Sequence, residues 1–163
     1  MEPGGWHLAQ VNVSTLLEPI ESARLEDFVA ALDPVNATAD AAPGFVWRLM
    51  AADGNATSIR AFDDPMVIVN LTLWESIEAL EAFAYGDPGH RAVMRGRSQW
   101  FERHQQASFA LWWIPAGELP TIADAAARLE HLRAHGPTQT AFTFRDRFSV
   151  DMDAPPAAEP ARA

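Results

Sequence analysis

The sequence predicts an α+β fold, in which a ferredoxin-like unit of the order β-α-β-β-α-β is followed by an appended C-terminal helix and strand. Continuous Val, Ile and Leu content over residues 67–74 is typical of a strand buried on both faces, and Ser76 then offers a hydroxyl to cap a helix. Alternation of apolar and polar residues over 8–13 predicts another strand. A chain of 163 residues, 48% of them hydrophobic, is long enough for one domain, which we place at residues 1–150.

The first half of the chain supplies a strand, a helix and a hairpin-like excursion. In the first strand Ala9, Val11 and Val13 point to one face, while Gln10 and Asn12 point to the other. A helix follows Pro19 and is expected to end near the Pro43 turn. Its apolar stripe has the spacing i, i+3, i+4, i+7 and consists of Leu25, Phe28, Val29 and Leu32. Residues 45–51 and 56–62 flank Asp53 and Gly54, a strong hairpin signal.

The central strand, 67–74, leads into a second helix that residues 86–89 divide into a short piece and a longer one over 90–104. Residues 109–114 form another strand. Thr121 and Asp124 open a last helix, which Gly136 closes, and residues 141–144 form a final short strand. Residues 151–163 are rich in Pro and Ala, have few apolar anchors and are expected to be a disordered tail.

Composition narrows the classes of function. A net charge of −10 argues against nucleic acid as a partner. No apolar run is long enough to span a membrane, and the first residues lack the features of a signal peptide, so we expect a cytoplasmic protein. The absence of cysteine excludes disulfides, thiol catalysis and Cys-ligated metal. Six tryptophans either fill the core or wall an aromatic ligand pocket.

The segment 90–104 carries polar residues in the middle of an apolar arc. At about 100° per residue, a helix over this segment groups its members on one side. The members are His90, Met94, Arg97, Phe101 and His104. We therefore expect His90 and Arg97 to point inward, toward a cavity or a buried partner. The alternatives are a structural hydrogen bond for His90, a salt bridge from Arg97 to Asp63 or Asp64, and dipole compensation by His104.

Other polar clusters give weaker evidence for a functional site. His131 and His135 are four residues apart beside Glu130, but they do not form a His-Glu-x-x-His motif and His131 points partly outward, so we do not expect metal there. Asp63 and Asp64 are interpreted as a turn, capping or salt-bridging pair. The sequence has no Gly-rich phosphate loop and no Gly-x-Ser-x-Gly motif, which disfavours nucleotide enzymes and the common hydrolases.

The passage from the central strand through Trp74, Glu75 and Ser76 to His90 resembles the central strand-to-helix passage of the antibiotic-biosynthesis-monooxygenase-like dimeric α/β barrels. The wider chain is still more similar to an uncharacterised bacterial family of that superfamily, a domain of unknown function. The matching stretches span nearly everything from residue 7 to residue 148, and they are residues 7–12, 43–48, 59–65, 100–103, 111–117 and 129–137.

The resemblance implies a dimeric α/β barrel, in which two sheets meet on their helix-free faces and each subunit has a pocket between sheet and helices. The resemblance therefore also implies that the protein is a homodimer. The haem-degrading monooxygenases of the superfamily carry a haem-ligating histidine at a position similar to His90. They also use an asparagine on the first strand, for which Asn12 or Gln10 could stand, and have a tryptophan near the place of Phe83.

Three functions remain open. The first is a monooxygenase-like small biosynthetic or detoxifying enzyme, acting without a cofactor on a flat aromatic or polyketide-like substrate, with His90 as base and Asn12 or Gln10 as oxyanion donors. Its polar contacts would be Gln10, Asn12, Asn70, His90 and Arg97, and its walls Trp74, Phe83, Met94, Phe101 and Trp112. The second is a haem protein with His90 as axial ligand. The third is a non-catalytic dimeric module that binds a small hydrophobic molecule.

Overall fold

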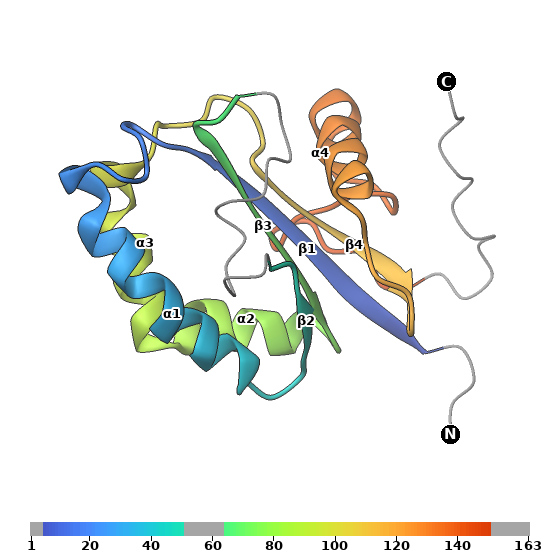
Figure 1. The fold of residues 1–163 in the computed structure, drawn as a ribbon. Coiled ribbons are helices and arrows are strands. Elements are labelled where there is room, and N and C mark those ends of the chain that lie inside the picture. Colours follow the sequence, from blue (N-terminus) through green and yellow to red (C-terminus); the bar gives the residue numbers. More distant parts are fainter. Residues whose placement is uncertain (1–4, 51–63, 151–163) are drawn as a thin grey trace.

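The computed structural model describes residues 5–50 and 64–150 of the chain. Its elements, in chain order, are β1 (Trp6–Thr15), the 3-10 helix η1 (Ala23–Leu25), α1 (Glu26–Asp40), β2 (Phe45–Arg48), β3 (Val67–Trp74), α2 (Ile77–Gly86), α3 (Pro88–Trp100), β4 (Phe109–Pro115) and α4 (Ile122–His135) (Figure 1). The expected strand over 56–62, its turn, Asp63 and the tail 151–163 lie outside the described residues. No described helix is both long and apolar enough to cross a membrane.

The four strands form one antiparallel sheet in the order β2-β3-β1-β4. β1 and β3 are the inner strands. This order, with α1 between β1 and β2 and with α2 and α3 between β3 and β4, is that of a ferredoxin-like unit. The predicted α+β fold is therefore confirmed.

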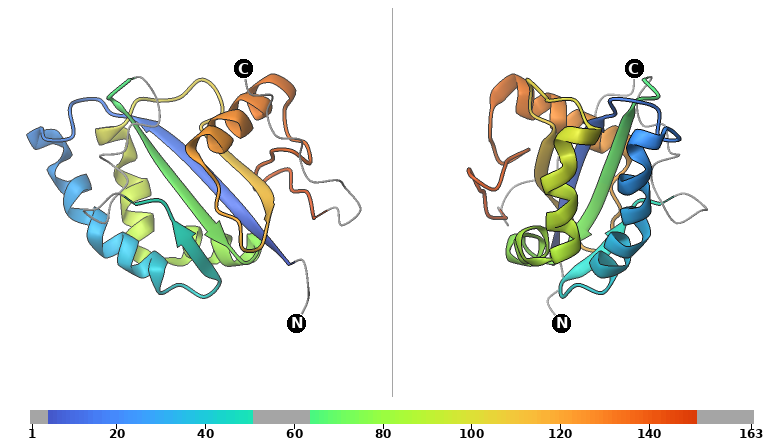
Figure 2. Two further views of the ribbon diagram at one scale, coloured as in Figure 1. Left: turned by 45° about the vertical axis from the view of Figure 1, so that its right-hand side comes forward. Right: turned by 90° about the vertical axis from the view of Figure 1, so that its left-hand side faces the viewer.

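One face of the sheet packs against α4, and we call it the α4 face. Odd-numbered residues of β1 and β3, among them Val11 and Leu71, share a buried cluster with Ala125 and Leu129 of α4. Figures 1 and 2 show α4 over β4, apart from α1, α2 and α3. The expectation of a helix-free sheet face is therefore wrong, because apolar residues of α4 and the apolar residues on this face of the strands bury each other.

The opposite face, which we call the helix face, has an apolar cluster at each end. One cluster consists of Leu8, Trp74, Ile77, Leu80, Leu111 and Phe142. The other consists of Leu16, Leu25, Phe28 and Trp100, with Ile68 packed against it. Between them, the even-numbered positions of β1 and β3 carry Gln10, Asn12, Asn70 and Thr72, which we call the polar strip.

The helix that follows β3 is divided as predicted. The hydroxyl of Ser76 accepts a hydrogen bond from the backbone N–H of Ala79 and caps α2. Asp87 caps α3, because its Oδ2 accepts from the backbone N–H of His90 at 2.8 Å, and Pro88 occupies the first turn, where its missing N–H costs nothing. Leu25, at the end of η1, and Phe28 of α1 are buried as expected, but Val29 is 42% exposed, so the buried stripe is narrower than predicted.

α3 ends at Trp100 and does not reach His104 as expected. The chain leaves the helix because its backbone pairs with the end of β1: the N–H of Leu17 donates to the carbonyl of Trp100, and that of Glu102 donates to the carbonyl of Thr15, both at 2.8 Å. Phe101 is extended, and the exposed His104 lies beyond the helix. The helical angles assigned to these two residues therefore do not apply.

The C-terminal part contains the predicted helix but not the predicted strand. A capping box of Thr121 and Asp124 opens α4, and Gly136, with a φ of 72°, follows its end. In the segment 141–144 only Phe142 pairs with β4, through two hydrogen bonds to Leu111 of 2.8 and 2.9 Å. Local turns on both sides of Phe142 keep its neighbours out of the sheet.

Candidate functional site

A chain of hydrogen bonds crosses the polar strip on the helix face. The indole Nε1–H of Trp74 donates to Thr72 Oγ1 at 2.9 Å, and Thr72 Oγ1 donates to Gln10 Oε1 at 2.7 Å. Gln10 Nε2 then donates to Asn12 Oδ1 at 2.8 Å. We call these four residues the relay. Gln10 and Thr72 are buried, so these bonds form away from water and hold both side chains in place.

The register of the strands explains why the relay forms. Gln10 stands opposite Thr72 and Asn12 stands opposite Asn70, which places all four side chains on one face of adjacent strands. Asn70 is exposed although β3 is an inner strand, and Asn12 is half-buried. The end of the relay at Asn12 is therefore accessible, while the end at Trp74 is enclosed by the core.

His90 stands beside the Trp74 end of the relay. Its ring lies 5.2 Å from the ring of Phe83, which stacks on Trp74 at 5.4 Å. His90 Nδ1 lies 2.8 Å from the carbonyl oxygen of Ala84. Since a carbonyl only accepts, Nδ1 carries a proton, and in the neutral form of the ring Nε2 keeps its lone pair. Within the described chain, Nε2 of this half-buried ring has no hydrogen-bond partner.

The structure therefore brings together several of the expected site residues on the helix face. They are Gln10, Asn12, Trp74, Phe83 and His90, with Asn70 beside Asn12. Two residues that the sequence did not single out complete the arrangement. Thr72 joins the two strands of the relay, and the signal for it is its spacing of two residues from both Asn70 and Trp74. The carbonyl of Ala84 orients His90 and has no sequence signal.

Arg97 and Met94 do not point inward. Arg97 is exposed and Met94 is 42% exposed. Apart from His90, the less exposed positions of α3 are Val93, Gly96 and Trp100, whose mean direction is rotated by about 90° from His90 at 100° per residue. His90 therefore lies at the edge of the packed arc, and Met94 lies beyond that edge. Arg97 lies between His90 and Val93 by angle, but its side chain is exposed.

Phe101 and Trp112, both expected to wall the pocket, also lie elsewhere. Phe101 packs edge-on against Phe28 of α1, with ring centroids 5.0 Å apart. Trp112 points to the α4 face, where its ring lies 5.8 Å from the guanidinium carbon of Arg128. Burial at that place lowers the pKa of Arg128. Trp112 was misplaced because the odd and even positions of β4 are both apolar, so the sequence alone does not show which face each one takes.

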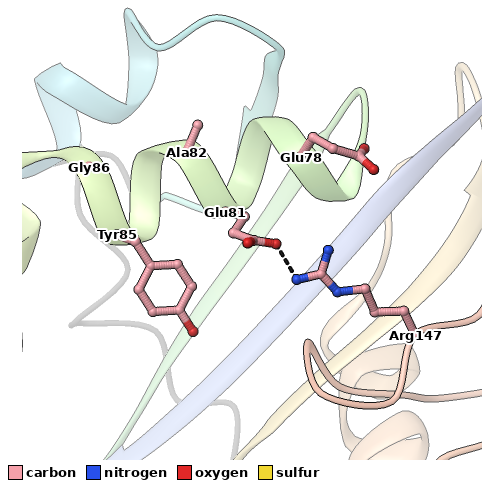
Figure 3. Close-up of a pocket in the computed structure, with 6 residues that line it drawn as sticks. All are labelled: Glu78, Glu81, Ala82, Tyr85, Gly86 and Arg147. Carbon is pink, nitrogen blue, oxygen red and sulfur yellow. Dashed lines mark hydrogen bonds and ion pairs between the residues drawn. The ribbon is translucent and has the colours of Figure 1, made fainter.

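Two surface depressions flank α2, and neither lies between the sheet and the helices. One is formed by α2 and the segment after α4, where Arg147 pairs with Glu81 (Figure 3); its lining is Glu78, Glu81, Ala82, Tyr85, Gly86 and Arg147. The other lies between the end of α1 and α2 and includes Phe83 and Asp87. His90 lines neither of them.

The described residues contain no group of three or more His, Asp or Glu side chains able to hold a metal ion. His131 and His135 stack with ring centroids 4.6 Å apart. His131 Nε2 lies 2.9 Å from Thr138 Oγ1, so this nitrogen already has a partner within the protein.

Comparison with known proteins identifies a family over most of the chain. Residues 7–158 match the model of a family described as Domain of unknown function (DUF3291). No curated protein matches the chain.

Several solved structures have a similar fold. Rv0793 from Mycobacterium tuberculosis is 15% identical, with a TM-score of 0.45, over 71% of this chain and 99% of that one. A putative antibiotic biosynthesis monooxygenase from Nitrosomonas europaea is 14% identical, with a TM-score of 0.43, over 73% and 95% of the two chains. SnoaB, a cofactor-independent oxygenase from Streptomyces nogalater, is 16% identical, with a TM-score of 0.41, over 69% and 95%.

Proposed function

We propose that this chain, which belongs to the DUF3291 family of domains of unknown function, binds a flat aromatic or polyketide-like molecule on the helix face of its sheet and oxygenates it as a monooxygenase-like enzyme. The observation that carries the proposal is the hydrogen bond that orients the ring of His90. Its Nδ1–H is held by the carbonyl of Ala84, which leaves Nε2 of the neutral ring free to act as a base beside the half-buried ring of Phe83.

The chemistry follows from these groups. His90 Nε2 removes a proton from a substrate CH₂ group that a conjugated carbonyl makes acidic, and the Nδ2–H of Asn12 donates to an oxygen at the far end of the same conjugated ring system, over which the negative charge spreads. Dioxygen then takes electrons from the substrate carbanion. The resulting hydroperoxide loses water, so that one CH₂ and one O₂ give one C=O and one H₂O. The substrate supplies all the electrons, and the protein supplies the base and the donor.

The contact chain from His90 to Asn12 also sets the shape of the ligand. It runs through Phe83, Trp74, Thr72 and Gln10 before it reaches Asn12. A molecule that meets both ends must therefore extend along the sheet. Fused aromatic rings have this extended, flat shape.

A haem protein is the second candidate, and His90 favours it in one respect. An axial histidine commonly donates its other ring N–H to a carbonyl, which orients the ligating nitrogen, and His90 does so with Ala84. A porphyrin also needs a flat apolar slot next to that nitrogen. His90 lines neither of the two depressions beside α2, so neither of them provides this slot.

One set of measurements separates the candidates. Purified protein is examined by absorbance spectroscopy and mass spectrometry, and oxygen uptake is then measured with anthrone, a flat three-ring ketone with an acidic CH₂. We expect no Soret band and an uptake of oxygen above that of anthrone alone. A Soret band would show bound haem and would favour the haem protein over the cofactor-free enzyme. Binding of anthrone without oxygen uptake would contradict the enzyme proposal and favour the non-catalytic binding module.

We also propose that the protein is a homodimer, with α1 of each copy against α3 of the other. α1 carries four acidic residues and no basic one, whereas α3 carries three arginines and no acidic residue. None of these arginines forms an ion pair within the described part of the chain. Each helix also exposes an apolar side chain, Val29 and Met94, both 42% exposed. Two copies placed in this way bring the acidic α1 of one against the basic α3 of the other and cover the exposed apolar side chains.

A further inference from the structure

We infer, resting on the proposed function, that the site is selective for a ligand that presents a hydrogen-bond acceptor to Asn12, such as a carbonyl or phenolate oxygen, and that Thr72 is the positioning residue that sets this selectivity. The two amides of the relay could in principle be turned either way, since oxygen and nitrogen have similar shapes. The direction of the relay decides which atom of Asn12 meets the ligand.

The hydroxyl of Thr72 fixes that direction. Its oxygen accepts from the indole N–H of Trp74, which can only donate. The hydroxyl proton then needs an acceptor, and Gln10 is the only other partner of Thr72 Oγ1 within the described residues. If Gln10 were turned so that its NH₂ group faced Thr72, this proton would be left buried without an acceptor. Gln10 must therefore present Oε1 to Thr72.

The orientation of Gln10 in turn determines the orientation of the Asn12 amide. With Oε1 of Gln10 facing Thr72, Nε2 faces Asn12 and donates to its Oδ1 at 2.8 Å. Asn12 is thereby oriented with its Nδ2 away from Gln10, and this group has no partner among the described residues. The half-buried amide at the accessible end of the relay is thus a donor. A ligand oxygen placed there gains a hydrogen bond, whereas a ligand N–H meets another N–H.

The test uses three flat tricyclic molecules of similar size. 9-Fluorenone carries a carbonyl acceptor, carbazole carries an N–H donor, and fluorene carries neither. Their dissociation constants are measured by fluorescence titration for the wild-type protein, Thr72→Val and Thr72→Ser. We expect the wild type to prefer fluorenone over carbazole by about tenfold, the ratio expected of one hydrogen bond. Thr72→Val frees the amides and should bring the ratio near one, and Thr72→Ser, which keeps the hydroxyl, should restore it.

Circular dichroism establishes that each variant is folded, so a change in the ratio is separated from loss of structure. A wild-type preference for carbazole, or an unchanged ratio in folded Thr72→Val, would overturn the inference. A purely structural role of Thr72 would weaken the binding of all three molecules alike and leave the ratio in place, which also overturns it.

A ligand-free measurement separates this inference from the proposed function. Neutron diffraction from a deuterated crystal places the deuterons of the Gln10 and Asn12 amides. Deuterons on Gln10 Nε2 that point to Asn12 Oδ1 support the relay direction, and deuterons on Asn12 that point to Gln10 overturn it. If none of the three tricyclic molecules binds, the aromatic-ligand proposal fails, while the neutron structure still decides the direction of the relay.

Discussion

Gly96 and Trp100 lie in direct contact on α3. A Cβ atom at position 96 would stand 2.6 Å from Cη2 of the Trp100 indole, well inside the distance that real Cβ contacts show. The indole is buried, only 7% exposed, between α1 and the end of β1, so it has little room to move. The absence of a side chain at Gly96 therefore allows α3 to pack against α1.

We predict that Gly96→Ala destabilises the protein. Overpacking of a tight site costs about 1–3 kcal/mol, and the better helix propensity of alanine returns about 1 kcal/mol, so the net loss in the free energy of unfolding should be on the order of 1 kcal/mol. Urea denaturation measures it. Gly86→Ala, in α2, is the matched control, because nothing lies within 4 Å of the added Cβ there. Equal stability of the two variants would show that the Trp100 indole moves aside at little cost, which contradicts the prediction.

His90→Ala should lower the turnover of anthrone by about two to four powers of ten, because the proposed base is removed, while binding of fluorenone changes little. Oxygen uptake and fluorescence titration measure the two quantities. His104→Ala is the control, since His104 is exposed and lies outside α3, and it should keep full turnover. Full turnover in His90→Ala would remove His90 from the mechanism.

Leu129→Ala should lower the free energy of unfolding by about 2–5 kcal/mol, because Leu129 is 1% exposed in the cluster between α4 and the sheet. Leu119→Ala makes the same chemical change at a residue that is 57% exposed, and it should change stability by less than about 0.5 kcal/mol. Chemical denaturation of both variants is the measurement. Similar values for the two leucines would mean that α4 contributes little to the fold in solution.

Met94→Glu should convert the proposed homodimer into a monomer, since it places a negative charge against the acidic α1 of the other copy and replaces an apolar contact. Light scattering at micromolar concentration gives the molecular mass. Leu119→Glu, on the loop after β4, adds the same charge to another exposed apolar residue and should leave a dimer. A monomeric wild-type protein, or a dimer that survives Met94→Glu, would contradict the proposed interface.

Acidification should destabilise the protein in part through His131. Burial, and then the nearby charges of His135 and Arg128, lower the pKa of His131 below its ordinary value of 6.5. The unfolded chain therefore binds this proton at a higher pH than the folded chain, and stability falls as the pH drops through about 6.5. Thermal denaturation between pH 8 and pH 5 should show a shallower loss for His131→Gln than for the wild type. An equal or steeper loss would assign the acid sensitivity to other groups.

The strands and the divided helix were predictable because their signals are local. Residues 8–13 alternate, residues 67–74 are rich in Val, Ile and Leu, and Asp87 with Pro88 marks a helix start that needs no tertiary context. The end of α3 was not predictable in the same way. Its periodic pattern continues past Trp100, and only pairing with the end of β1, far away in the sequence, stops the helix there.

The candidate site was predictable in its residue types but not in its connections. The polar side chains of Gln10 and Asn12 stand out in an apolar strand, and His90 stands out beside a helix break. The role of Thr72 depends on the register between β1 and β3, which no local pattern gives. The face taken by Trp112 depends on where α4 packs, and that is settled by the whole sheet rather than by the seven residues of β4.

The covering of the sheet by α4 also has a consequence during synthesis on the ribosome. All four strands have been made by Pro115, but the helix that seals one side of them follows only at Ile122–His135. Until then the nascent chain displays Val11, Leu71 and Trp112 without their cover, the kind of surface that chaperones bind and that aggregates when it stays open. Premature termination before α4 should therefore yield insoluble fragments rather than a smaller working domain.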